Sequence, residues 1–327
     1  MVIFDKLGKT TRAACFGLFL AMTVSSPALA MDVVRVSLLP YLTFAPLFIA
    51  EDEGYFKAEN INIDFQKIKT SDAIALLAQG ELDVQAGFVS TGFFNAIGRG
   101  ANLKIVADKG YADADSCGAD AVMVPAASYQ EISSAPTLLR SRPISISAAS
   151  VEEFLIERMF ESIGLDYREN QNLRLRGPSE LDALRKGQVS LVLTGEPWVS
   201  RIRDAGAGEI FKPVREIYPD FQFAILSFGP TLLQGNRDLG KRFMRAYLRG
   251  VRQYNEGATD RNVDIITNHM KLDEDTLNRI CWPQFRNDGQ INTTSVKDFH
   301  DWAVRHELVR TALQLDDYWD AGFLTQP

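Results

Sequence analysis

The chain has 327 residues, of which 24% are charged, and a formal net charge of −7 at pH 7. This surplus of acidic side chains argues against nucleic acid and anionic membranes as partners, because both carry negative charge themselves. The length suits one large domain or two of medium size.

The first 30 residues have the three zones of a secretory signal peptide. Basic side chains precede an apolar stretch, 13–24, that is shorter than the roughly 20 residues needed to span a bilayer. The small residues Ala28 and Ala30 then form a signal-peptidase site. We expect cleavage near Ala30 and export to the periplasm, with an uncleaved anchor helix as the alternative. Cys15 precedes most of the apolar stretch, so it is not placed as a lipid-attachment cysteine.

Beyond residue 31, short β-branched runs alternate with amphipathic segments, which is typical of an α/β fold with mainly parallel strands. Asp72 is expected to cap the helix at 73–79, and Gly80 to end that helix. Strands are predicted at 33–38, 61–65, 82–87, 103–107 and 120–124, and helices at 45–53, 73–79 and 93–97.

The pattern restarts after 125–143, a segment with three prolines and several serines that is interpreted as a linker. From Arg237 onward the chain is expected to be helical, beginning with a helix at 239–254. The prediction is therefore two similar βα halves followed by a helical tail. In the second half, strands are predicted at 144–147, 173–175, 189–194 and 221–228, and helices at 151–163, 179–186 and 197–205.

The side chains of common catalytic and metal sites are sparse. The three histidines, His269, His300 and His306, all lie in the helical tail. Ligands of α/β sheets bind at the carboxyl ends of strands, away from that tail. No glycine-rich phosphate loop or nucleophile elbow occurs. We therefore expect no enzymatic activity, no cofactor and no metal.

Five loops that follow predicted strands and open helices are rich in hydroxyl, amide and aromatic groups. Free N–H groups at helix starts, together with Ser and Thr hydroxyls, suit a ligand that carries oxygen or negative charge. Ordinary capping and core packing would account for any one loop, but five of them at strand ends indicate a shared cleft. The loops are 39–46, 69–72, 88–92, 147–150 and 194–198.

Two cysteines, Cys117 and Cys281, remain after removal of the signal peptide. In an exported protein they can form a disulfide, but two free buried thiols are an equal alternative.

Several of these segments resemble the nitrate/sulfonate/taurine and thiamine-precursor (pyrimidine) branch of ABC-transporter substrate-binding proteins. The likeness begins in 41–56, with Ala45-Pro46, Ala50 and Glu53-Gly54-Tyr55-Phe56. It continues in 78–83 (AQGELD), 95–107 and 195–198 (GEPW), and extends from about residue 33 to 254.

The resemblance implies a periplasmic-binding-protein fold of type II, with two lobes that close on a solute by hinge motion. Lobe one would comprise 31–125 and 223–327, and lobe two 126–222, with the tail packed on lobe one. The implied partners are a small molecule and an ABC permease, and the protein is expected to be a monomer. The positions that match the family's binding loops are Tyr41, Thr43, Phe44, Ser90, Thr91, Ser147, Ser150, Glu196 and Trp198.

One departure from the family bears on the ligand. The five loops contain no arginine, whereas sulfonate or nitrate favours a fixed cation. Lys69 and Lys109 are the nearest basic candidates. Glu196 either supports the hinge or faces the cleft, where it would favour N–H donors or positive charge. Together with Tyr41 and Trp198, which can stack on a planar body, this favours a neutral or nitrogen-bearing organic ligand, such as a heterocycle.

Two other functions fit parts of the same pattern. A ligand-sensing subunit of a membrane receptor would use the same cleft. An enzyme of the related pyrimidine-synthesis type would need a cysteine- and histidine-rich iron site near the cleft, for which the chain offers only Cys117.

Overall fold

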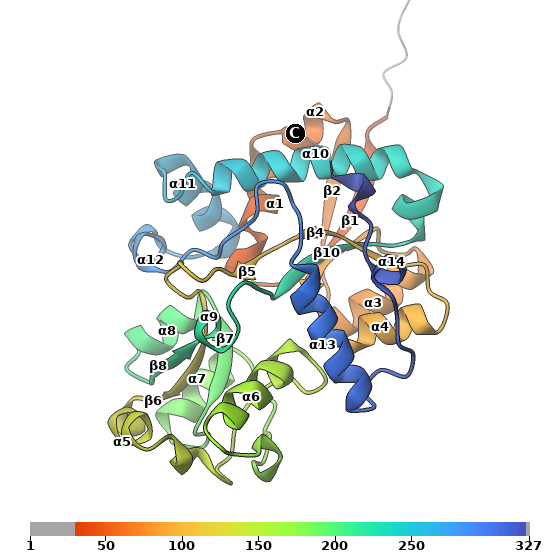
Figure 1. The fold of residues 1–327 in the computed structure, drawn as a ribbon. Coiled ribbons are helices and arrows are strands. Elements are labelled where there is room, and N and C mark those ends of the chain that lie inside the picture. The colour runs from red at the N-terminus through yellow and green to blue at the C-terminus, as the bar shows by residue number, and fades with distance from the viewer. Residues whose placement is uncertain (1–29, 325–327) are drawn as a thin grey trace, which may run out of the picture. The chain divides into compact units, whose positions relative to one another are not determined.

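The computed structural model describes residues 30–324, which, apart from Ala30, belong to the compact unit that begins at Met31 (Figure 1). The expected signal segment lies outside the described residues except for Ala30. Among residues 30–324, no helix combines the length and the apolar character that crossing a membrane requires.

The first sheet has five strands in the order β2-β1-β3-β10-β4. Four of them run in the same direction, and β10 is reversed between β3 and β4. This sheet confirms the expected mixed α/β fold with mainly parallel strands. Its strands are β1 (Asp32–Leu38), β2 (Ile61–Lys67), β3 (Val84–Phe88), β4 (Lys104–Asp108) and β10 (Ala224–Phe228).

Helices cover both faces of this sheet, because its strands carry apolar side chains on both sides. On one face α10 packs against α1 and α2, and Gly250 allows the close approach, since a side chain there would meet the Pro46 carbonyl. On the other face lie α3 and α4. The bounds are α1 (Ala45–Asp52), α2 (Tyr55–Ala58), α3 (Thr70–Gln79), α4 (Thr91–Gly98) and α10 (Arg237–Tyr254).

The start of α3 differs from the prediction. Lys69 is the N-cap residue, so Asp72 lies in the first turn instead of capping the helix. A carboxylate in the first turn still complements the helix dipole. Gly80 ends the helix in the left-handed conformation, as expected.

The second sheet is β7-β6-β8, in which β6 runs antiparallel to both neighbours. Each sheet thus contains one reversed strand. The strands are β6 (Asp120–Pro125), β7 (Val192–Gly195) and β8 (Gly208–Pro213), and the surrounding helices are α5 (Tyr129–Ser134), α6 (Val151–Ser162), α7 (Pro178–Arg185), α8 (Trp198–Asp204) and α9 (Val214–Ile217).

Three predictions for this part of the chain are wrong. In the strand expected at 144–147 only Ile144 and Ser145 form isolated bridges, to Asn172 and Val192, and no residue of the strand expected at 173–175 forms a bridge. The expected linker 125–143 contains α5 and two 3-10 turns that bury Ile132 and Leu139. The sequence pattern also does not predict β8, whose residues are mostly half-buried and lack a clear alternation.

The chain passes between the sheets twice, and the two crossings are hydrogen-bonded to each other. It leaves the first sheet after Asp108 and returns before Ala224. On the way, β5 (Tyr111–Ala112) pairs antiparallel with β9 (Phe221–Gln222). The strand β6 belongs to the second sheet, so the first crossing comes earlier than the expected position at Pro125.

A buried amide holds this crossing together. The Gln222 side chain is fully buried, and its Nε2 donates to Asp108 Oδ1 at 2.6 Å and to the Ala224 carbonyl at 2.8 Å. Its Oε1 accepts from Arg286 at 3.0 Å and from the Asn292 backbone at 3.1 Å. Gln222 therefore connects both crossings to the C-terminal tail.

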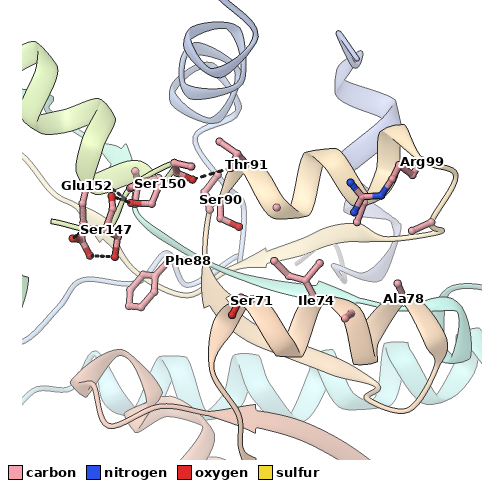
Figure 2. A pocket seen from close by; sticks show the side chains of 18 of the residues that line it. Ser71, Ile74, Ala78, Phe88, Ser90, Thr91, Arg99, Ser147, Ser150 and Glu152 are labelled. Atoms are coloured by element: carbon pink, nitrogen blue, oxygen red, sulfur yellow. Dashed lines mark hydrogen bonds between the residues drawn. The ribbon is translucent and has the colours of Figure 1, made fainter. Parts of the chain in front are cut away.

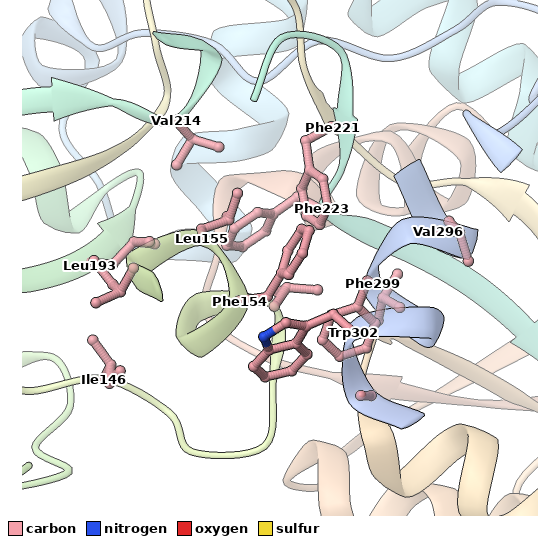
Figure 3. Packing of buried hydrophobic residues seen from close by; sticks show 14 of the residues in the cluster. Ile146, Phe154, Leu155, Leu193, Val214, Phe221, Phe223, Val296, Phe299 and Trp302 are labelled. Atoms are coloured by element: carbon pink, nitrogen blue, oxygen red, sulfur yellow. The ribbon is translucent and has the colours of Figure 1, made fainter. Parts of the chain in front are cut away.

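The tail is helical, as predicted, but not all of it packs on the first sheet. α13 lies against both α4 and α6. Phe154 of α6 is 5.8 Å from Phe299 and 5.5 Å from Trp302, measured between ring centres (Figure 3). One continuous apolar core thus joins elements of both sheets. The tail helices are α11 (Asp260–Met270), α12 (Glu274–Arg279), α13 (Thr293–Arg305) and α14 (Leu315–Tyr318).

The two cysteines are bonded to each other. Cys117 and Cys281 form a disulfide that links the crossing before β6 to the segment after α12, across 164 residues of sequence. Of the two alternatives left open by the sequence, the structure has the disulfide.

The Gln222 network predicts a large loss of stability on truncation. Gln222→Ala removes the amide that donates to Asp108 and the oxygen that accepts from Arg286 and Asn292. These three partner residues are buried or half-buried. We expect the free energy of unfolding to fall by about 2–4 kcal/mol, since buried polar groups lose their partners. Urea denaturation measures this. Gln290→Ala, at an exposed position, is the control, and equal effects of the two changes would contradict a special role for Gln222.

Candidate functional site

Two cavities lie where the strand-end loops of the two sheets face one another. The inner cavity has a volume of about 20 Å³ and the outer one about 660 Å³, and Phe88 and Glu152 line both. The inner volume holds about one water molecule. An organic ligand can therefore enter the inner cavity only if its walls separate.

Backbone and hydroxyl contacts between the loops of the two sheets keep the inner cavity closed. The Leu42 N–H donates to the Glu196 carbonyl at 3.2 Å. Thr91 Oγ1 donates to the Ala149 carbonyl at 2.9 Å (Figure 2). Ser90 and Ser150 form an isolated antiparallel bridge. These contacts are local to the strand ends, whereas the apolar packing of α6 against α13 also joins elements of the two sheets.

Three aromatic side chains form one wall of the inner cavity. Tyr41 meets Phe88 edge to face at 5.3 Å, and Phe88 meets Phe223 in the same way at 5.5 Å. Such a wall suits a planar or apolar body. Burial, with smaller contributions from Glu152 and Glu180, raises the pKa of Tyr41 to about 12. The phenol is thus protonated at neutral pH and can donate a hydrogen bond.

Arg176 is the cation that lines the inner cavity. It contacts the Ser147 hydroxyl, and its guanidinium lies 3.2 Å from Glu152 Oε2 and 3.1 Å from Glu180 Oε1. Glu152 in turn accepts from the Ser147 N–H at 2.7 Å. The guanidinium is therefore already engaged by two carboxylates.

Carboxyl groups outnumber this cation. Asp120, Glu152, Glu180 and Glu196 all line the inner cavity. Burial raises the pKa of Glu180 to about 8, and Arg176 opposes the rise. Burial likewise raises the pKa of Asp120 to about 7, with Glu196 adding to the rise and Lys109 opposing it. Such shifts mark a site where negative charge is costly without a cationic partner.

Glu196 lines the inner cavity and also contacts the start of α8. Its Oε1 and Oε2 accept from the Ser200 hydroxyl and N–H at 2.8 and 3.1 Å, so it stabilises the first turn of α8. Its side chain also lines the inner cavity. The Cys281 N–H lies 3.4 Å from Oε1, which brings the disulfide segment to the same wall.

Lys109 lies beneath the wall of the inner cavity and does not line it. Its Nζ donates to Thr43 Oγ1 at 2.9 Å and lies 3.8 Å from the centre of the Phe44 ring. Burial lowers its pKa to about 7, an effect that Asp108 and Asp120 oppose. Lys109 therefore positions Thr43, which does line the cavity.

The outer cavity is a groove between α3 and α4 that the loop 147–152 closes at one end (Figure 2). Its walls are mostly small or apolar, with Ile74 and Ala78 contributed by α3. Arg99 lies at the end away from Glu152. The Ser90 hydroxyl is buried here without a hydrogen-bond partner among the described residues.

The structure brings seven of the nine predicted residues to the two cavities. Phe44 and Trp198 lie outside both. Phe44 packs under Lys109, and Trp198 packs against Gly177 and Arg201. The Ser150 hydroxyl caps α6, accepting from the Glu152 N–H. Tyr41, Thr43 and Glu196 line the inner cavity, and Ser90, Thr91, Ser147 and Ser150 line the outer one.

Sequence reasoning missed Arg176 and three carboxylates, Asp120, Glu152 and Glu180. Arg176 directly follows the segment predicted as a strand at 173–175, and its loop is not among the five. The Gly177-Pro178 pair, which opens α7, is the signal that could have revealed it. Lys69, one of the two basic candidates, lines a different cavity. Within the described residues, no three His, Cys, Asp or Glu side chains converge as a metal site.

Comparisons with known proteins agree on family and fold. The family model described as NMT1/THI5 like matches residues 42–256. A search of curated proteins by sequence found no match.

Several solved structures share the fold at low sequence identity. The ligand-binding component of an ABC-type import system from Staphylococcus aureus, solved with zinc bound, has a TM-score of 0.74 and 17% identity, covering 90% of this chain and 98% of that one. The periplasmic nitrate-binding protein NrtA from Synechocystis has a TM-score of 0.74 and 10% identity, covering 90% of this chain and 87% of that one. The alkanesulfonate-binding protein SsuA from Xanthomonas axonopodis, bound to MOPS, has a TM-score of 0.67 and 14% identity, covering 89% of this chain and 98% of that one. The desulfurization enzyme DSZB also matches, with a TM-score of 0.62 and 12% identity, covering 89% of this chain and 97% of that one.

The raised pKa values predict how stability depends on pH. An unfolded chain releases the Asp120 and Glu180 protons near pH 4, whereas the folded chain keeps them to about pH 7 and 8. Their contribution is fully present below about pH 4 and is lost as pH rises through the folded pKa values. We expect Asp120→Asn to be stabilised relative to wild type more at about pH 7 than at about pH 5 in urea denaturation. A difference that is the same at both pH values would contradict the raised pKa of Asp120.

Proposed function

The chain belongs to the NMT1/THI5-like family, and from this we propose that it is an exported solute-binding protein for a small nitrogen-bearing organic ligand. The inner cavity is the observation that carries the proposal. Four carboxyl groups and one guanidinium surround a wall of Tyr41, Phe88 and Phe223. The ligand best matched to these groups is a planar ring with N–H donors or a positive charge.

The charges of the inner cavity disfavour a bare anion. Nitrate or a sulfonate would need a free cation, but Arg176 is engaged by Glu152 and Glu180. Such an anion would also approach Asp120 and Glu196, whose charged forms are already disfavoured by burial. The proposed ligand therefore differs from those named for the nitrate- and alkanesulfonate-binding neighbours.

The pKa values suit a heterocycle in another way. A protonated carboxyl donates a hydrogen bond to a ring nitrogen, and an ionised one accepts from an amino group. Asp120 and Glu180, with pKa values of about 7 and 8, can take either form near neutral pH. A ring that presents both kinds of nitrogen can pair with them at low desolvation cost.

We assign the first sheet and the tail to lobe one and the second sheet to lobe two, with the β5–β9 pair as the hinge. Two backbone crossings that lie side by side allow rotation about a single axis. An opening motion of this kind separates the contacts around the small inner cavity and also the packing of Phe154 against Phe299 and Trp302. The import-system component among the fold neighbours supports delivery of the ligand to an ABC permease outside the cytoplasm.

The ligand class is tested by calorimetric titration with an aminopyrimidine, taurine and nitrate. We expect the aminopyrimidine to bind and Asp120→Asn to weaken its binding by about tenfold or more, the usual effect of losing a hydrogen bond to a charged group. Asp260→Asn, at an exposed position of α11, is the control and should change little.

Tight binding of nitrate or taurine without any heterocycle binding would overturn the proposed ligand class. Mass spectrometry of material released from the purified protein identifies the natural ligand. Incubation of that ligand with the protein then separates binding from catalysis, since a binding protein returns the ligand unaltered.

Hinge closure predicts a second effect. Thr91→Ala removes the hydroxyl that bonds the Ala149 carbonyl across the cleft, so we expect ligand affinity to fall roughly twofold to tenfold. Ligand should also reduce the radius of gyration of wild type in X-ray scattering and raise its melting temperature. Thr137→Ala, an exposed position, is the control. Scattering that stays unchanged at saturating ligand would contradict lobe closure.

A further inference from the structure

A separate cavity of about 410 Å³ lies outside the cleft, at the ends of β1 and β2. It is lined by the segments 38–40 and 67–69, by Phe48 of α1 and by 269–271 at the end of α11. None of these residues lines the inner or the outer cavity. Its volume falls within the range of small-molecule sites.

The floor of this cavity is apolar and held rigidly. Phe48 is 4% exposed, and its ring is stacked on the His269 ring with centres 4.4 Å apart. His269 is fixed in turn by Asp52, 2.8 Å from its Nε2. Leu39 and Met270 are half-buried beside this pair and pack against the core. The cavity therefore offers an apolar surface that does not depend on mobile side chains.

Three lysines surround this floor, although the protein as a whole is acidic. The side chains of Lys67, Lys69 and Lys271 are exposed, and none forms an ion pair or a side-chain hydrogen bond with another described residue. Asp52, the carboxylate in contact with the cavity wall, is already engaged by His269. Three uncompensated ammonium groups next to an apolar floor leave a local positive charge that a ligand can neutralise.

We propose that this cavity binds a small amphipathic organic anion. The apolar part of the ligand, an alkyl chain or an aryl ring, lies on Phe48, Leu39 and Met270. Its carboxylate, sulfonate or phosphate is held among Lys67, Lys69 and Lys271. Burying the apolar part contributes about 25 cal/mol per Å², and the charge-assisted hydrogen bonds set the preference for anions. The site is independent of the ligand in the cleft.

Decanoate and decanol are suitable probes, because they share the apolar chain and differ in charge. We expect calorimetry to show saturable binding of decanoate, with decanol at least about tenfold weaker. The combined variant Lys67→Gln/Lys69→Gln/Lys271→Gln should weaken decanoate binding by about tenfold or more. The control Lys57→Gln/Lys186→Gln/Lys241→Gln removes the same charge at exposed positions outside this cavity and should change binding less than about twofold.

Two further measurements distinguish binding in this cavity from a general effect of charge and from attachment to a membrane surface. Met270→Glu places a carboxylate on the floor and should abolish decanoate binding while the lysines remain. Circular dichroism and the melting temperature show whether each variant folds. Binding that is unaffected by the lysine variant, or weakened equally by both triple variants, would overturn the proposal. So would lysine-dependent sedimentation with phosphatidylglycerol vesicles without binding of free decanoate, which would indicate a membrane surface instead.

Discussion

The hydrogen bond between Gln222 and Asp108 is the interaction on which the rest of the structure depends. Both side chains are buried where the chain crosses between the two sheets, and Asp108 also accepts from the N–H groups of Gly110 and Arg286. Buried polar groups stabilise a fold only when their partners are in place. Because these partners come from both crossings and from the tail, the two sheets and the C-terminal helices are positioned together, and the strand-end loops meet as a consequence.

Burial of carboxyl groups is costly both at the crossing and in the inner cavity. At the crossing burial raises the pKa of Asp108, although its oxygens and the Gln222 side chain all have hydrogen-bond partners, and in the inner cavity burial raises the pKa values of Asp120 and Glu180. Apolar side chains would fill the same space with better stability. A group of carboxyls that is retained despite this cost is more readily explained by a ligand than by folding. The lysine-lined cavity at the end of α11 differs, because its three lysines are exposed and their charge lacks a partner instead of being buried.

The elements that the sequence predicted well are those whose pattern is local. β1, α6 and α10 have regular apolar spacing and α1 is a nearly continuous apolar run, and the structure has all four within a few residues of the predicted bounds. The segments 144–147 and 173–175 have the composition of strands, but the first forms only isolated bridges and the second forms none. β-propensity describes a fit to a half-buried sheet surface, so it does not tell whether a neighbouring strand is present.

The sequence by itself determined the alternation of strands and helices, the family likeness, and the loops that carry Tyr41, Thr43, Ser90 and Glu196. These depend on short-range spacing, which is readable along the chain. Only the tertiary structure decided that Arg176 lies between Glu152 and Glu180, that Cys117 is bonded to Cys281, and that Trp198 packs away from the cleft. Each of these depends on which distant segments meet in space. The charge of the inner cavity, and with it the proposed ligand, is set by contacts that no local pattern records.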